Sequence, residues 1–307
     1  MAGMATITLD EIERHHPDVL LPPDPEFADD YAAAVQAGRE IAKTKTVALV
    51  AICRNAMPWL PRTLELVEQT GAMFREWSAY IHENDSADET KEVLAAWSDG
   101  QKRHVSLNDY GRPHLNYTTA PVRTHALAEY RAACQTFVRN GERPDYVIVF
   151  DTDPWGGWGV DGVATSVAHM AWDSTLYGLA SYSWGEWEPP IAPRPMAIHY
   201  DAFACRLNHW RQRDQQWFHH WHPPIGSPPV EVNSAFGQLA IYDGLRFLQG
   251  RYHGSDCEHV TFHRSIQSAA MEEEGDYYHG PGGTRMALNP AMRCVSFWIP
   301  EETKRGG

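Results

Sequence analysis

From residue 46 onward, the chain alternates short apolar runs with amphipathic segments. The apolar runs of strand length occupy residues 46–52 (TVALVAI), 77–81 and 145–150 (DYVIVF). A β-branched run that is apolar on both faces predicts a central strand of a parallel sheet. Helices are expected from Pro58 and Pro61 to about residue 74, over residues 88–97 and over residues 123–140. This alternation predicts an α/β fold with a doubly wound, mostly parallel sheet flanked by helices.

The pattern changes outside this region. Residues 1–45 read as an extension, with a proline-rich stretch followed by a helix over residues 27–43. Residues 154–229 are rich in Gly, Pro, Trp and His and have poor periodicity, which predicts long loops and short elements that carry a binding surface. Regular structure is expected again over residues 230–249, as a helix over residues 257–271 and as a closing strand over residues 291–299.

Composition narrows the class of protein. The chain has 307 residues, is 43% apolar, and carries 26 basic against 40 acidic side chains, a net charge of −14. This length allows one large or two ordinary domains, and no run approaches the roughly 20 apolar residues of a membrane span. The beginning of the chain does not resemble a signal peptide. Five scattered cysteines without a CxxC pair argue against a disulfide framework and favour the cytoplasm.

Polar sequences follow each of the three predicted strands. These are Arg54-Asn55, then residues 83–85 (END), then Asp151-Thr152-Asp153. Ligands of open parallel sheets bind at the carboxyl ends of the strands, so these side chains are expected to meet. Two carboxylates spaced Asp-x-Asp supply the hard oxygen ligands that Mg²⁺ or Mn²⁺ prefers.

The strings VALVAICRN, YIHENDSADET and DYVIVFDTD resemble the nucleotide-sugar half of GT-A glycosyltransferases. Further along, VNSAFGQLAIY and DCEHVTFHRSI are similar to the acceptor half of bacterial and capsule-type members. The resemblance implies one continuous GT-A domain after the extension 1–45, with a nucleotide-sugar-binding half (46–153) and an acceptor-binding half (154–307). It also implies a Mn²⁺- or Mg²⁺-dependent transferase that moves a sugar from a UDP- or GDP-sugar to a hydroxyl of a glycan or cell-surface polysaccharide.

The resemblance assigns roles to residues of this chain. Asp151 and Asp153 are expected to hold the metal on the diphosphate, and a late histidine, His263 in preference to His259, completes the metal site. The residues expected around the nucleotide and its phosphates are Arg54, Asn55, Glu83, Asp85, Asp88, Arg123 and Thr152. An inverting enzyme needs a carboxylate to take the proton of the acceptor hydroxyl, and Asp256 or Glu258 would fill that role. A retaining enzyme requires no such base, and the sequence leaves the stereochemistry open.

The sequence leaves three other functions open. The segment LNHWRQRDQQWFHHWH (207–222) with Arg206, Arg211 and Arg213 suits a glycan, but it also suits an extruded base, as in phage enzymes that glycosylate 5-hydroxymethylpyrimidines in DNA. His259 and His263 have the i, i+4 spacing of zinc hydrolases, although HExxH itself is absent. A non-catalytic carbohydrate-binding module would use the tryptophans 184, 187, 210, 217 and 221.

Overall fold

A ten-stranded mixed sheet runs through the whole molecule in the computed structural model, which describes residues 8–115, 118–187, 196–210, 216–274 and 283–297. The path through the sheet is β3 (Arg103–Asn108), β2 (Glu76–Asn84), β1 (Thr46–Cys53), β4 (Tyr146–Asp151), β9 (Leu239–Asp243), β6 (Leu176–Trp187), β10 (Arg285–Phe297) and β5 (Gly157–Trp158). Two short strands lie off this path: β7 (Met196–His199) pairs with β6, and β8 (Val230–Val232) pairs with β10.

The first four strands of the path are parallel to one another, whereas β9 is antiparallel to both β4 and β6. The predicted strands at 46–52, 77–81 and 145–150 are confirmed as β1, β2 and β4 with small changes at their ends. The expected α/β class is confirmed, with a sheet that is mixed because β9 runs antiparallel to both of its neighbours, β4 and β6. The division into halves at residue 153 stays a prediction.

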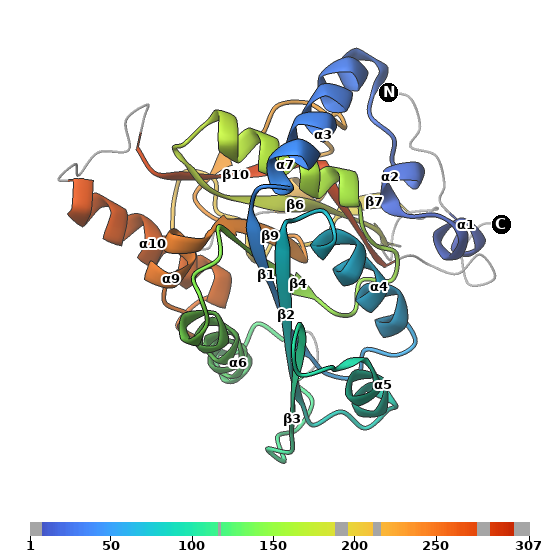
Figure 1. Cartoon of the computed structure of the whole chain (residues 1–307), viewed down its shortest axis with the longest axis vertical. Helices are drawn as coiled ribbons and strands as arrows, with labels where there is room; N and C mark the ends of the chain where they lie inside the picture. Colours follow the sequence, from blue (N-terminus) through green and yellow to red (C-terminus); the bar gives the residue numbers. More distant parts are fainter. Residues whose placement is uncertain (1–7, 116–117, 188–195, 211–215, 275–282, 298–307) are drawn as a thin grey trace.

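Each central strand buries both of its faces, because helices cover both sides of the sheet (Figure 1). In β1, Ala48 and Val50 pack into one core, and Val47, Leu49 and Ala51 pack into the other. This alternation is the period-two pattern that pleated strands impose.

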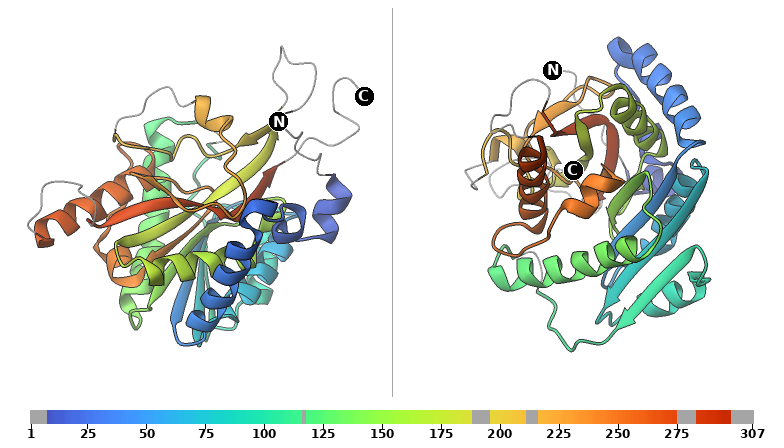
Figure 2. Two further views of the ribbon diagram at one scale, coloured as in Figure 1. Left: turned by 90° about the horizontal axis from the view of Figure 1, so that it is seen from above. Right: turned by 60° about the vertical axis from the view of Figure 1, so that its left-hand side comes forward.

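The helices divide between the two cores. One face carries α3 (Ala28–Ala42), α4 (Leu60–Gly71), α5 (Thr90–Trp97) and α7 (Val160–Trp172). The other face carries α6 (Pro121–Asn140), α9 (Gly244–Gln249) and α10 (Glu258–Glu274). These three helices contact one another, and Figure 2 shows them from two further sides. The short helices are α1 (Leu9–Arg14), α2 (Pro17–Leu20), η1 (Pro25–Phe27) and α8 (Gln216–His219).

The segment before residue 46 is tied closely to the rest of the fold. Helix α3 packs against α7 so tightly that a Cβ on Gly38 would lie 1.8 Å from the carbonyl oxygen of Ala164. Asp18 accepts hydrogen bonds from the N–H of Asp161 (3.0 Å) and of Gly162 (3.4 Å) at the beginning of α7. The predicted helix over 27–43 is confirmed as α3, which forms part of one helical layer, while Ile12 and Leu21 of the same segment join the other core.

One expectation for the second half of the chain is wrong. Residues 154–229 contain helix α7 and the twelve-residue strand β6, where the pattern predicted loops and short elements. The edge strand β3 was not anticipated either, because its residues are only partly buried and show no apolar run. Among the described residues, no helix combines the length and the apolar character that crossing a membrane requires.

Candidate functional site

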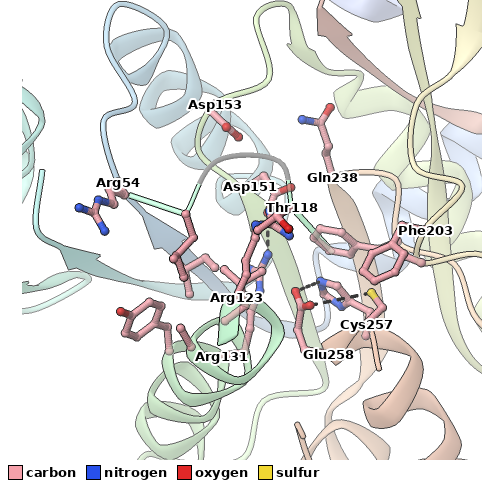
Figure 3. A pocket seen from close by; sticks show the side chains of 18 of the residues that line it. Arg54, Thr118, Arg123, Arg131, Asp151, Asp153, Phe203, Gln238, Cys257 and Glu258 are labelled. Atoms are coloured by element: carbon pink, nitrogen blue, oxygen red, sulfur yellow. Dashed lines mark hydrogen bonds and ion pairs between the residues drawn. The ribbon is translucent and has the colours of Figure 1, made fainter. Parts of the chain in front are cut away.

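A cavity of about 480 Å³ opens at the carboxyl ends of β1, β2 and β4. Its wall includes the loop before α6, the first turns of α6, residues 200–204 and the beginning of α10 (Figure 3). The prediction that the ends of these three strands meet at one edge of the sheet is therefore confirmed. Some of the expected side chains reach the cavity and others do not.

Strained backbone conformations surround this cavity. Asn55, Asp85 and Gln238 have positive φ angles of 49°, 53° and 69°, which residues other than glycine seldom adopt. The loops after β1 and β2 hold each other, since Asn55 accepts a 2.8 Å hydrogen bond from the N–H of Ala87. Asp85 accepts a 2.7 Å bond from the N–H of Gly111. Such strain persists where the surrounding structure fixes it, and it is common at functional sites.

Four of the residues expected around the nucleotide do not line the cavity: Asn55, Glu83, Asp85 and Asp88. Glu83 is completely buried and accepts hydrogen bonds from the N–H groups of Ser86 and Asn108. Asp88 accepts from the N–H groups of Met57 and Thr90. These carboxylates hold the loops in shape, and Asn84 is the residue of this segment that lines the cavity.

The other three, Arg54, Arg123 and Thr152, do line the cavity. Arg54 donates to the carbonyl oxygens of Arg112 (2.8 Å) and Pro113 (3.2 Å), so it also fixes the loop before α6. The side chain of Arg123, in the first turn of α6, makes no hydrogen bond within the described part of the chain and is directed at the cavity (Figure 3). Arg123 is therefore a cation with donors available to an anionic ligand.

Asp151 and Asp153 lie together at the end of β4, and both line the cavity. Asp153 is exposed within the cavity although protein surrounds it on most sides, and burial together with the neighbouring Asp151 raises the pKa of Asp153 to about 6. Two carboxylates that repel each other in a partly dehydrated site favour a bound cation.

Arg131 is a buried residue of α6 that the sequence did not single out. Its guanidinium forms a 2.6 Å ion pair with Asp151 and donates to the carbonyl oxygen of Phe150 at 3.3 Å. Although burial opposes it, Asp151 and Glu258 raise the pKa of Arg131, so the guanidinium stays charged. Arg131 thus neutralises part of the acidic charge from beneath the cavity.

Asp201 and Gln238 also line the cavity and were missed. Burial raises the pKa of Asp201 to about 6, although the N–H of Gly237 donates to the carboxylate, and Asp151 adds to the rise. Asp201 comes from a segment without regular periodicity or a recognisable motif. Gln238 lies within VNSAFGQLAIY, a string that pointed to the acceptor half of the family but not to this residue.

The structure separates the two expected bases. Glu258 is the second residue after Asp256, lines the cavity and is 6% exposed. Burial raises the pKa of Glu258, and Arg131 opposes the rise. Asp256 is not among the residues that line the cavity, and both of its carboxylate oxygens bind the guanidinium of Arg206, at 2.8 and 3.0 Å. Glu258 is thus the one available for proton transfer.

The expected metal ligand His263 does not reach the cavity. It is completely buried, with Nδ1 bonded to the hydroxyl of Ser234 (2.8 Å) and Nε2 to that of Tyr242 (2.9 Å). Both ring nitrogens are therefore occupied, which contradicts its assignment to the metal and weakens the zinc-hydrolase alternative. His259 does line the cavity and stacks on Phe236. Its nitrogens make no hydrogen bond, but Nε2 lies 3.6 Å from Oε1 of Glu258.

Within the described residues, no set of three or more His, Cys, Asp or Glu side chains is already grouped to hold a metal ion. The residues nevertheless fit a cation whose shell is completed by phosphate oxygens, because Asp153 is accessible and Asp151 keeps one oxygen free of Arg131.

The aromatic residues of the second half contribute chiefly to packing. Trp184 is 1% exposed, and Trp210 and Trp221 pack against the core that contains it. The side chains of Trp187 and Trp217, and the segment with Arg211 and Arg213, lie outside the described residues. The tryptophans that are described therefore do not form an exposed stacking surface of a binding module.

Comparisons with known proteins bear on the fold. No family model matches the chain, and no curated protein matches it by sequence. Among solved structures, GalNAc-T7 with UDP, GalNAc and Mn²⁺ superposes with a TM-score of 0.50 at 13% identity, covering 92% of this chain. The chain spans about half of that protein, 54% of its length.

Two further structures match less well. The mannosyltransferase PcManGT from Pyrobaculum calidifontis, in complex with GDP-Man and Mn²⁺, gives a TM-score of 0.43 at 14% identity, covering 91% of this chain and 68% of that one. S. aureus TarS 1–349 gives 0.45 at 8% identity, covering 81% and 60%. The likeness to GalNAc-T7 shows that this chain has the GT-A fold of glycosyltransferases.

Proposed function

We propose that this protein is a metal-dependent glycosyltransferase that moves a sugar from a nucleotide-sugar donor to a hydroxyl acceptor. The observation that carries the proposal is one cavity lined by Asp151, Asp153, Arg123 and Glu258 at the carboxyl ends of the parallel strands of a GT-A fold. Acidic, cationic and proton-accepting groups thereby converge on a volume suited to a small ligand. The solved structures of this fold with UDP or GDP-Man and Mn²⁺ support the same donor class.

The donor half of the reaction needs positive charge, because negative charge develops on the departing nucleoside diphosphate. Asp153 and the free oxygen of Asp151 would hold Mn²⁺ or Mg²⁺, which supplies Lewis-acid stabilisation of that charge when bound. His259 also lines the cavity, with its Nε2 facing Oε1 of Glu258 at 3.6 Å. Arg123 binds phosphate oxygens from the other side, and Arg54 keeps the loop before α6 in position for the nucleoside.

The acceptor half needs a base. Glu258 takes the proton of the attacking hydroxyl as the new glycosidic bond forms and the bond to the diphosphate breaks. Burial raises the pKa of Glu258, which makes it a stronger base than an exposed glutamate, while Arg131 favours the ionised form. An arrangement with a base at this position favours inversion at the anomeric carbon.

The proposal is tested by thermal unfolding with UDP and with GDP, each in the presence and absence of Mn²⁺. We expect a stabilisation that requires both nucleotide and metal, as ligand binding to the folded state demands. Asp153→Asn should abolish it while leaving the unliganded transition in place. Asp30→Asn is the control, since Asp30 is exposed on α3 and does not line the cavity.

An unchanged nucleotide response in Asp153→Asn, or a response that persists in chelator, would refute metal dependence. Release of nucleoside diphosphate from a panel of UDP- and GDP-sugars then identifies the donor. Glycan oligosaccharides and DNA containing 5-hydroxymethylcytosine, offered in parallel, separate the two acceptor classes. We propose a glycan hydroxyl, and transfer to the DNA alone would replace it with the modified base. The cytoplasmic location stays a prediction.

A further inference from the structure

The wall of the cavity formed by residues 200–206 has no regular secondary structure, yet it is held at both ends. Near its beginning, Asp201 accepts a 3.0 Å hydrogen bond from the N–H of Gly237. At its end, the backbone of Arg206 exchanges two hydrogen bonds with Ser234, of 2.8 and 3.0 Å. Phe203 lies between these anchors and lines the cavity, as Cys257 also does (Figure 3). The position of Phe203 is therefore set by the groups that anchor this wall.

Arg206 is the centre of that anchoring. Its side chain is completely buried, and its guanidinium donates to the carbonyl oxygens of Phe203 (2.9 Å), Cys205 (2.8 Å) and Trp210 (3.1 Å). The remaining nitrogen binds both oxygens of Asp256. A planar guanidinium that uses donors on every side fixes the relative positions of all its partners.

Asp256 connects this wall to the next functional element. It stands two residues before the beginning of α10, and Oδ1 also accepts a 2.7 Å hydrogen bond from the N–H of Cys257. Glu258, the carboxylate that lines the cavity, is the first residue of that helix. The ion pair between Arg206 and Asp256 therefore links the carbonyl oxygen of Phe203 to the residue that precedes Cys257 and Glu258.

We infer that Arg206 and Asp256 are a positioning pair that sets the separation between the Phe203 wall and the carboxylate of Glu258, and so fixes where the acceptor hydroxyl is held. The inference rests on the proposed function. Neither residue lines the cavity, so each acts through its neighbours, and Asp256 has no direct part in the proton transfer. A base must stand within about 2.6–3.2 Å of the proton it removes, and a misplacement of about 1 Å can cost roughly 10²-fold in rate.

The experiment compares Arg206→Lys, Asp256→Asn and Glu258→Gln with the wild-type chain. Binding of UDP with Mn²⁺ is measured by calorimetry, and release of nucleoside diphosphate is measured with water as the acceptor, on a panel of UDP- and GDP-sugars. We expect Arg206→Lys and Asp256→Asn to bind UDP within about twofold of wild type, since neither lines the cavity. Their kcat should fall roughly 10–100-fold. KM for the donor should change little. A general loss of stability would not lower kcat while leaving KM and UDP binding unchanged.

Two controls sharpen the comparison. Adding Asp256→Asn to Glu258→Gln should cause no further loss of kcat, because both changes act through the same carboxylate. Arg285→Lys, which alters an arginine paired with Asp173 and Glu231 outside the cavity, should keep wild-type kcat. If Arg206→Lys does not fold, Asp256→Asn and the double variant still test the pair.

Wild-type kcat in both Arg206→Lys and Asp256→Asn would overturn the inference. Asp256→Asn as inactive as Glu258→Gln, with Arg206→Lys fully active, would also overturn it, because Asp256 would then be the base itself. A wild-type chain that binds no UDP with Mn²⁺ and releases no nucleoside diphosphate would instead overturn the proposed function, and the inference with it.

Discussion

Replacing Arg131 by methionine tests the electrostatic design of the cavity floor. Arg131 is 2% exposed and pairs with Asp151 at 2.6 Å, while the Asp151 side chain keeps 26% of its surface exposed. Removing one partner of a fully buried ion pair costs about 3–5 kcal/mol, and water at the exposed side of Asp151 reduces this to about 2–3 kcal/mol. With roughly 2–4 °C per kcal/mol for a chain of this size, Tm should fall by about 4–12 °C.

The assay is urea unfolding of Arg131→Met and Arg123→Met side by side. Both arginines are on α6 and line the same cavity, but Arg123 is only half-buried and has no ion pair within the described residues. Arg123→Met should stay within about 0.5 kcal/mol of wild type. Adding Asp151→Asn to Arg131→Met should recover part of the loss, since the uncompensated charge is removed. Equal midpoints for the two single variants would refute the reasoning.

Further predictions concern stability and pH. Burial lowers the pKa of His263 to about 3, so the folded state holds it neutral while the unfolded state protonates below about 6.5. Its contribution to stability should therefore be complete above pH 6.5 and fall by about 1.4 kcal/mol by pH 5.5, a slope that His263→Gln should lack in denaturant titrations. Gly237→Ala should cost at least about 2 kcal/mol, because its φ is +64° and a Cβ would lie 2.1 Å from the carbonyl oxygen of Ser181. Gly100→Ala, at φ +67° with open space around it, should cost only about 1–2 kcal/mol, and equal unfolding midpoints for the two would contradict the steric part of the argument. Mn²⁺ affinity should weaken as pH falls through about 6, where Asp153 gains a proton, and calorimetry at pH 5.5 and 7.5 measures this.

The sequence determined where the cavity would form. The apolar runs of β1, β2 and β4 identified parallel strands, and parallel strands bring their carboxyl ends to one edge of a sheet. The polar residues after each strand therefore had to meet, and Asp151 with Asp153 could be singled out from spacing alone. The helices α4, α5 and α6 followed from the same alternation.

Tertiary structure decided which side chains of each segment face the cavity. Glu83 and Asn84 are adjacent, yet the carboxylate turns inward to cap a loop and the amide lines the cavity. Asp256 and Glu258 are separated in the same way by the buried guanidinium of Arg206, which comes from fifty residues earlier in the chain. No local pattern encodes the direction of a side chain that depends on such a distant partner.

The strand β6 illustrates the same limit in the core. Its residues include Gly178, Ser181 and Ser183, which break the hydrophobic pattern that predicts a strand. In the fold both serines are completely buried, and Gly178 leaves room for the ring of Tyr242 on the adjacent strand. Small residues are required there because neighbouring side chains fill the space, and only the packed structure shows which neighbours those are.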